Sequence, residues 1–223
     1  MDRINQRWVL ISMTAMVVAV GAFTSTAQAT WIVNMSEGGT FVIGQVQNRA
    51  RAVFKPSAGG GCRLIDLAGV DGGLNDHLAF FGSESTDVLQ VAAGPTNFCN
   101  FEVTPLVTNG FSIRAEMRGG NDIVLNDTIQ RMRVYGGWGA DRLMNMTFDF
   151  NFETYGGGDD DFFFMGDNGL SFGEGGNDFF CTAPGQQGFL VGSGGPDFDT
   201  GCGPTLLWDT TENIPPNCSC SLF

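Results

Sequence analysis

Glycine-rich turns that end in aspartate recur through the second half of the chain, and this repetition constrains the fold more than any other feature. Each turn runs into apolar or aromatic residues. The terminal aspartates are Asp122, Asp141, Asp161, Asp178 and Asp197, at intervals of 19, 20, 17 and 19 residues. Weaker copies occur at Gly72–Asp76 and around Asp87, so the array covers most of the chain.

The segments between these turns have the two-residue period of β-strands. In Met146–Glu153, phenylalanines alternate with polar residues, as expected for a strand buried on one face. Glycines at the corners allow positive φ where the chain reverses, whereas each glycine would cost a helix about 1 kcal/mol. We therefore expect an all-β protein.

A repeat of about 18 to 20 residues with two strands and two turns forms one coil of a parallel β-solenoid. We expect the coils to span residues 67–204. An N-terminal cap is predicted over residues 30–66, with strands at Trp31–Val33, Phe41–Val46 and Ala50–Phe54. Residues 205–223 are predicted to form a disulfide-tied C-terminal cap, and one domain accounts for the whole chain.

The first 29 residues have the three parts of a secretory signal peptide. Arg3 and Arg7 precede an apolar run at 8–23, and Ala27-Gln28-Ala29 forms a cleavage site. The apolar run is shorter than the ~20 residues that a spanning helix needs. We expect cleavage after Ala29 and a secreted mature chain, in an extracellular, periplasmic or cell-surface location.

The charge of the chain is strongly negative and unevenly distributed. The sequence has 24 Asp and Glu against 11 Lys and Arg, and no Lys or Arg follows Arg142. Such a surface argues against nucleic acid and anionic membranes as partners. The many phenylalanines argue against disorder, because they can build a core. Whether the chain binds a partner on a cell surface or in a matrix, and which one, stays open.

Six cysteines in an exported chain suggest disulfide bonds. Our hypothesis pairs Cys62 with Cys99. It pairs the two residues Cys181 and Cys202 with Cys218 and Cys220. Zinc binding is disfavoured, because the chain has no Cys-x-x-Cys pair and a single histidine, His77.

Stacking of the repeats places equivalent corner aspartates about 4.8 Å apart. Two carboxylates at that distance repel by about 3.5 kcal/mol at an effective dielectric constant of about 20. Protonation, outward splaying into solvent or a bound cation could relieve this repulsion. Calcium fits best, because the turns offer carboxylate oxygens and accessible backbone carbonyls, and calcium tolerates irregular oxygen cages better than magnesium.

The turns resemble the calcium-binding nonapeptides of the repeats-in-toxin (RTX) hemolysin-type family, G-G-x-G-x-D-x-U-x with U apolar. Residues 136–144 match in full, whereas Asp159, Glu174 and Ser193 replace glycines in later copies. The resemblance implies a parallel β-roll with calcium between the turns of successive coils. The opposite edge, near Asp127, Asn151, 169–171 and 184–188, has no regular aspartate, so we expect one ordered ion column.

The implied calcium ligands belong to the turns. They are Asp122, Gly136, Trp138, Asp141, Gly156, Gly158, Asp159, Asp161, Asn177, Asp178, Gly192, Gly194 and Asp197. For any single turn, an equally good interpretation is that aspartate only builds the corner by accepting backbone N–H bonds.

Together these features predict a secreted calcium-binding protein with a binding or structural role and with folding coupled to calcium. The alternative is a secreted carbohydrate-active enzyme on a β-solenoid, using carboxylates and arginines from the set Arg114, Arg118, Arg131, Arg133 and Arg142. A deep groove that holds arginine and two carboxylates, away from the aspartates, would favour the enzyme. No residue stands out as catalytic.

Overall fold

The computed structural model describes residues 15–20, 30–67, 77–106, 112–128, 131–146, 152–166, 169–182, 191–193, 197–202, 207–209 and 220. All regular secondary structure in these ranges is β, which confirms the all-β prediction. The described residues include no helix that is long and apolar enough to cross a membrane.

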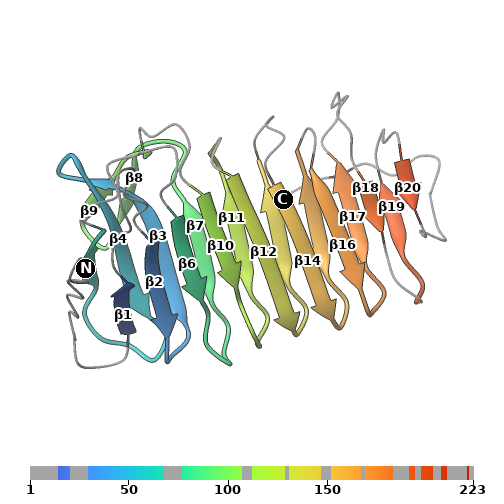
Figure 1. Cartoon of the computed structure of the whole chain (residues 1–223), viewed down its shortest axis with the longest axis horizontal. Coiled ribbons are helices and arrows are strands. Elements are labelled where there is room, and N and C mark those ends of the chain that lie inside the picture. Colours follow the sequence, from blue (N-terminus) through green and yellow to red (C-terminus); the bar gives the residue numbers. More distant parts are fainter. Residues whose placement is uncertain are drawn as a thin grey trace, which may run out of the picture.

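Two nine-stranded sheets make up an elongated stack, and from residue 77 onward the strands of each sheet follow one another along its long axis in chain order (Figure 1). The first, sheet A, has the order β1 (Ala15–Val20), β2 (Thr30–Met35), β6 (His77–Phe81), β10 (Ser112–Glu116), β12 (Arg131–Trp138), β14 (Phe152–Gly158), β16 (Leu170–Glu174), β18 (Val191–Ser193) and β20 (Leu207–Asp209).

The second, sheet B, has the order β19 (Thr200–Cys202), β17 (Phe179–Thr182), β15 (Phe162–Met165), β13 (Arg142–Asn145), β11 (Ile123–Asn126), β7 (Val88–Val91), β3 (Gly39–Val46), β4 (Arg49–Pro56) and β5 (Arg63–Asp66). A separate antiparallel hairpin is formed by β8 (Thr96–Phe98) and β9 (Phe101–Val103).

From β10 onward the strands alternate between the two sheets, and each pairs in parallel with neighbours of its own sheet. We use the word repeat for one strand of sheet A and the strand of sheet B that follows it. Both sheets are open, with β1 and β20 at the ends of sheet A and β19 and β5 at the ends of sheet B.

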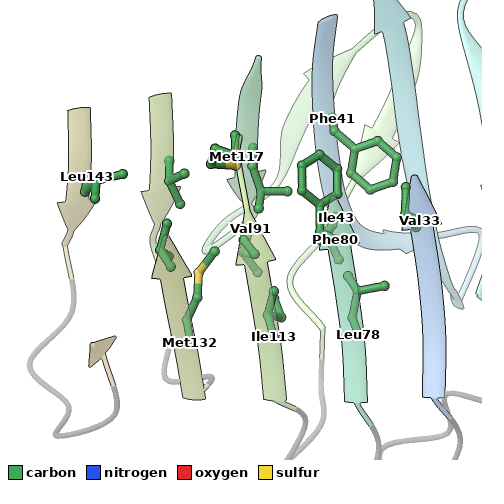
Figure 2. Packing of buried hydrophobic residues seen from close by; sticks show 14 of the residues in the cluster. Val33, Phe41, Ile43, Leu78, Phe80, Val91, Ile113, Met117, Met132 and Leu143 are labelled. Atoms are coloured by element: carbon green, nitrogen blue, oxygen red, sulfur yellow. The ribbon is translucent and has the colours of Figure 1, made fainter. Parts of the chain in front are cut away.

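The hydrophobic core lies between the sheets, because inward residues alternate with outward ones along each strand. The parallel register aligns Leu78, Ile113 and Met132 in one row of sheet A (Figure 2). In sheet B, Phe163 and Phe180 are fully buried and stack with ring centroids 4.6 Å apart. The core is therefore a set of ladders of equivalent residues.

The three strands predicted in the N-terminal region are confirmed as parts of β2, β3 and β4. β2 and β3 pair in parallel with β6 and β7, whereas β4 and β5 add antiparallel strands at the end of sheet B. β1 lies in the predicted signal peptide and pairs antiparallel with β2, so cleavage after Ala29 would make β2 the edge strand.

The predicted disulfide between Cys62 and Cys99 is confirmed, and it ties the segment before β5 to the turn between β8 and β9. Cys181 of β17 bonds to Cys220, which is one of the two partners that the hypothesis allowed for it. Cys202 is also disulfide-bonded. The part of the hypothesis that concerns Cys218 lies outside the described residues.

Two adjacent phenylalanines of β15 test where the folding free energy comes from. Phe163 is fully buried, whereas its neighbour Phe162 is half-buried on the outer face. Phe163→Ala should lower the free energy of unfolding by about 3 to 5 kcal/mol, because it empties a core position. Phe162→Ala should cost clearly less. Urea denaturation of both variants checks this, and equal losses would contradict the packing described here.

Candidate functional site

Six buried aspartates form a column at the corner between the sheets. Each lies directly before a strand of sheet B, and each is 0 to 2% exposed. We call this set the aspartate column: Asp87, Asp122, Asp141, Asp161, Asp178 and Asp199. The column contains four of the five aspartates that the turn pattern predicted.

Backbone hydrogen bonds to one carboxylate oxygen hold the column together. The N–H of each aspartate donates to Oδ1 of the aspartate in the next repeat, at 2.7 to 2.9 Å from Asp87 through Asp178. The backbone carbonyl of each of these residues accepts a bond from the residue after the next aspartate, as from Arg142 to Asp122 at 2.8 Å. The aspartates therefore accept backbone N–H bonds at the corner, as in the interpretation that gives them a purely structural role. These bonds join one repeat to the next and do not lie within a single turn.

The second carboxylate oxygen is buried and has no hydrogen-bond partner in Asp122, Asp141, Asp161 and Asp178. A methyl group built on Gly136 would overlap Asp141 Oδ2 and would lie 2.5 Å from the Gly156 carbonyl oxygen. A methyl group on Gly156 would likewise overlap Asp161 Oδ2 and lie 2.8 Å from the Gly173 oxygen. Because these glycines have no Cβ, Oδ2 of an aspartate in one repeat and a backbone carbonyl oxygen of the next repeat both come close to the position that the Cβ would fill.

Burial raises the pKa of these carboxyls far above the ordinary 3.8. It raises the pKa to about 8 for Asp122 and Asp161 and to about 7 for Asp141 and Asp178. Neighbouring carboxylates raise the pKa values further, whereas the backbone N–H bonds lower them. An unpaired buried carboxylate oxygen is costly, so each Oδ2 favours a proton or a cation as its partner.

The turns before Asp122, Asp141, Asp161 and Asp178 have positive φ at two positions, four and two residues before the aspartate. The pairs are Arg118 and Gly120, Gly137 and Gly139, Gly157 and Asp159, and Glu174 and Gly176, with φ between 75° and 121°. Glycine recurs there because other residues pay about 1 to 2 kcal/mol in this conformation. Arg118, Asp159 and Glu174 adopt it nevertheless.

An outer row of exposed turn residues runs beside the column. Asp159 Oδ2 accepts the Gly139 N–H at 3.1 Å, and Asp197 Oδ2 accepts the Gly176 N–H at 3.1 Å. Asn177 donates to Asp160 Oδ1 and accepts the Phe198 N–H. These side chains therefore link successive turns from the solvent side.

The prediction that Asp197 continues the column is wrong. β17 and β19 pair with Phe179 opposite Thr200, so Asp199 is the residue that meets Asp178, 21 positions along the chain. The glycine-rich turn pattern matches Asp197, but residue 199, two positions later, is also an aspartate. Asp197 lies in the outer row, and its predicted role as a calcium ligand stays a prediction.

The remaining predicted ligands occupy different places. Gly136 and Gly156 adjoin the unpartnered oxygens, whereas the Trp138 side chain is 75% exposed and its carbonyl accepts the Gly120 N–H at 2.9 Å. Gly158 lies against the Trp138 ring. Gly192 is in β18 opposite Ser171. Gly194 lies outside the described residues, as do Asn151, 184–188 and the weak copy at 72–76.

No group of three or more His, Cys, Asp or Glu side chains able to hold a metal occurs in the described part of the chain. A cation at the column would therefore take most of its ligands from backbone carbonyls. At the other end of the sheet B strands, Asn126 and Asn145 are buried in register, and no aspartate occupies that row in the described residues. Asp127 beside it is partly buried, which raises the pKa of its carboxyl.

A groove of about 620 Å³ lies along the N-terminal ends of the sheet A strands from β6 to β16, away from the column. Its lining includes Arg114, Arg131, Arg133 and Glu153. Glu153 is the only carboxylate among the described lining residues, and Arg133 Nε donates to it at 2.7 Å. On sheet A, Tyr155 stacks with Tyr135 and with Phe172.

Comparisons of the chain with family models, curated proteins and solved structures found no match. The functional argument therefore rests on the residues of the aspartate column and on the groove of sheet A.

Two glycine substitutions test the backbone of the turns. Gly137 has φ of 108°, and a Cβ there would overlap the Arg118 carbonyl oxygen. Gly137→Ala should therefore lower the free energy of unfolding by about 1 to 2 kcal/mol or more. Gly61→Ala is the control, because its Cβ would enter open space. Denaturant unfolding compares the two, and equal stabilities would refute the strained turn.

The pKa shifts predict an unusual pH dependence in chelator. Because burial raises the pKa values of the column carboxyls, the folded state holds protons that the unfolded chain releases above about pH 4. Their contribution to stability is complete below pH 4 and is lost as the pH rises through 7 to 8. Thermal unfolding in EDTA should show falling stability from pH 5 to pH 9, with a shallower fall in Asp141→Asn. A rise over that range would contradict the burial argument.

Proposed function

We propose that this chain is a secreted calcium-binding repeat protein whose parallel strands form an RTX-like β-solenoid completed by calcium along the aspartate column. The observation that carries the proposal is the row of four buried, unpartnered Oδ2 atoms at Asp122, Asp141, Asp161 and Asp178. Buried carboxylate oxygens need a positive partner.

Protein cations do not supply that partner. The five ion pairs among the described residues involve none of these four aspartates, and no Lys or Arg follows Arg142 in the sequence. Protonation alone would leave these carboxyls partly ionised at neutral pH, because their pKa values are about 7 to 8. A divalent cation supplies the missing charge at every pH at which the carboxyls are ionised.

Oxygen donors of the right kind adjoin these atoms. Calcium accepts carboxylate and carbonyl oxygens in irregular arrangements, and the carbonyls of Gly156 and Gly173 approach the places where Asp141 and Asp161 present Oδ2. Because each site offers few carboxylates, we expect binding in the weak range of extracellular calcium modules, about 10⁻⁴ to 10⁻³ M.

Calcium binding is coupled to folding under this proposal. A carboxylate of one repeat and a carbonyl of the next come together only when the repeats stack, so the unfolded chain has no such site. The ion neutralises the column and stabilises the stack, which suits a structural or binding role.

Secretion is supported by the disulfides Cys62–Cys99 and Cys181–Cys220, since such bonds persist in oxidising compartments. The N-terminal signal pattern points the same way. The carbohydrate-active enzyme has less support. The sheet A groove holds arginines, but its single described carboxylate is paired with Arg133, so the two-carboxylate arrangement is missing from the described lining.

Thermal unfolding of residues 30–223 in EDTA and in millimolar calcium tests the proposal. Each occupied site should add about 1.4 kcal/mol when calcium is at about ten times its Kd. Equal unfolding temperatures in the two conditions, with no heat of binding in calorimetry, would contradict it.

The variant Asp141→Asn separates calcium from protonation. The amide keeps an Oδ1 acceptor for the Asp122 N–H but carries no charge, so this variant should match or exceed the parent in EDTA at pH 8 and respond less to calcium. Glu102→Gln removes one exposed negative charge elsewhere and should leave the calcium response unchanged. A parent protein that gains stability from acid but not from calcium would support protonation instead.

A further inference from the structure

Asp87 differs from the next four column aspartates, Asp122, Asp141, Asp161 and Asp178, because both oxygens of its carboxylate have protein donors. Its Oδ2 accepts the Ser83 N–H at 2.6 Å and the Ser83 hydroxyl at 2.9 Å. Its Oδ1 accepts the Gly39 N–H at 2.9 Å. Asp87 therefore has no unpartnered oxygen, although it is as deeply buried as the others.

The reason is local and lies four residues before the aspartate. The corresponding residues in the next four repeats, Arg118, Gly137, Gly157 and Glu174, all have positive φ, whereas Ser83 does not. Ser83 thus directs both its N–H and its hydroxyl at Asp87 Oδ2. The Ser85 N–H donates to the hydroxyl oxygen of Ser83, Oγ, at 3.1 Å and helps to orient this hydroxyl.

The N-terminal part around Asp87 is also held by other protein groups. β4 and β5 extend sheet B by antiparallel pairing, and the Cys62–Cys99 disulfide closes the region. Basic side chains are present here as well, with Arg63 near Glu37 and Arg51 near Asp66. None of these interactions needs a metal ion.

We propose that Ser83 takes the place of the cation in the first aspartate turn, so that the cation sites begin at Asp122 and the strands from β2 to β9 fold without calcium. This N-terminal part then acts as a template for the calcium-dependent repeats from residue 112 onward. The template presents two backbone groups of Asp87 to the next repeat. The Asp87 N–H donates to Asp122 Oδ1 at 2.7 Å, and the Asp87 carbonyl accepts the Ile123 N–H at 2.9 Å. The inference rests on the proposed calcium function and says where in the chain that function starts.

Hydrogen exchange with mass spectrometry on the mature, disulfide-bonded chain tests this in EDTA and in millimolar calcium. Peptides from 30–106 should exchange at the same rate in both conditions, within about twofold. Peptides from 112–182 should exchange at least about tenfold faster in EDTA. A calcium-dependent change of the same size in both regions would overturn the inference and leave the calcium function standing. No calcium effect in any peptide would overturn both.

Variants of Ser83 supply a second arm. Ser83→Gly removes the hydroxyl and permits the backbone conformation of the later turns, so peptides 77–91 should become calcium-dependent, with exchange in EDTA at least about tenfold faster than in calcium. Ser57→Ala, at an exposed serine of the same region, is the control and should change nothing. Full protection of peptides 77–91 in EDTA in Ser83→Gly would overturn the role of Ser83. If this variant does not fold, the exchange pattern of the parent chain still decides the inference.

Discussion

The hydrogen bond from the N–H of one buried aspartate to Oδ1 of the next organises this molecule. It joins residues 35, 19, 20, 17 and 21 positions apart, so it keeps the same contact while the length of chain between corners varies. The parallel strands that follow each aspartate then start in register, and the apolar ladders of the core follow from that register. Charge-assisted bonds of this kind are among the strong ones in proteins.

The same arrangement creates the electrostatic problem of the fold. A carboxylate that uses Oδ1 to bind its neighbour buries Oδ2 as well. Asp87 has protein donors for that second oxygen, whereas Asp122, Asp141, Asp161 and Asp178 have none. The carboxylates point inward rather than toward solvent, and Gly136, Gly156 and Gly173 leave the space that Oδ2 occupies. The fold and the proposed cation requirement therefore have one origin, the burial of an aspartate in each turn before a strand of sheet B from β7 to β19.

Several features of the site could be predicted from the residues alone. Alternating phenylalanines and corner glycines predicted parallel strands and turns, and the spacing of Asp122, Asp141, Asp161 and Asp178 placed them in one column. The choice between Asp197 and Asp199 could not be made, because both follow the same glycines and only the pairing of β19 with β17 decides between them. The exposure of Trp138 and the groove on sheet A also depend on which strands become neighbours.

The sequence by itself determined that this chain forms β-strands with sharp turns, that acids recur at those turns, and that no basic residue accompanies them beyond Arg142. These are local properties of glycine, aspartate and alternating phenylalanine. The tertiary structure alone decided which carboxylate oxygen is bonded and which is left without a partner. The reason is that the donors, such as the Asp122 N–H for Asp141, belong to another repeat and arrive only when the repeats stack. The distinct character of Asp87 likewise depends on Gly39, which lies 48 residues away.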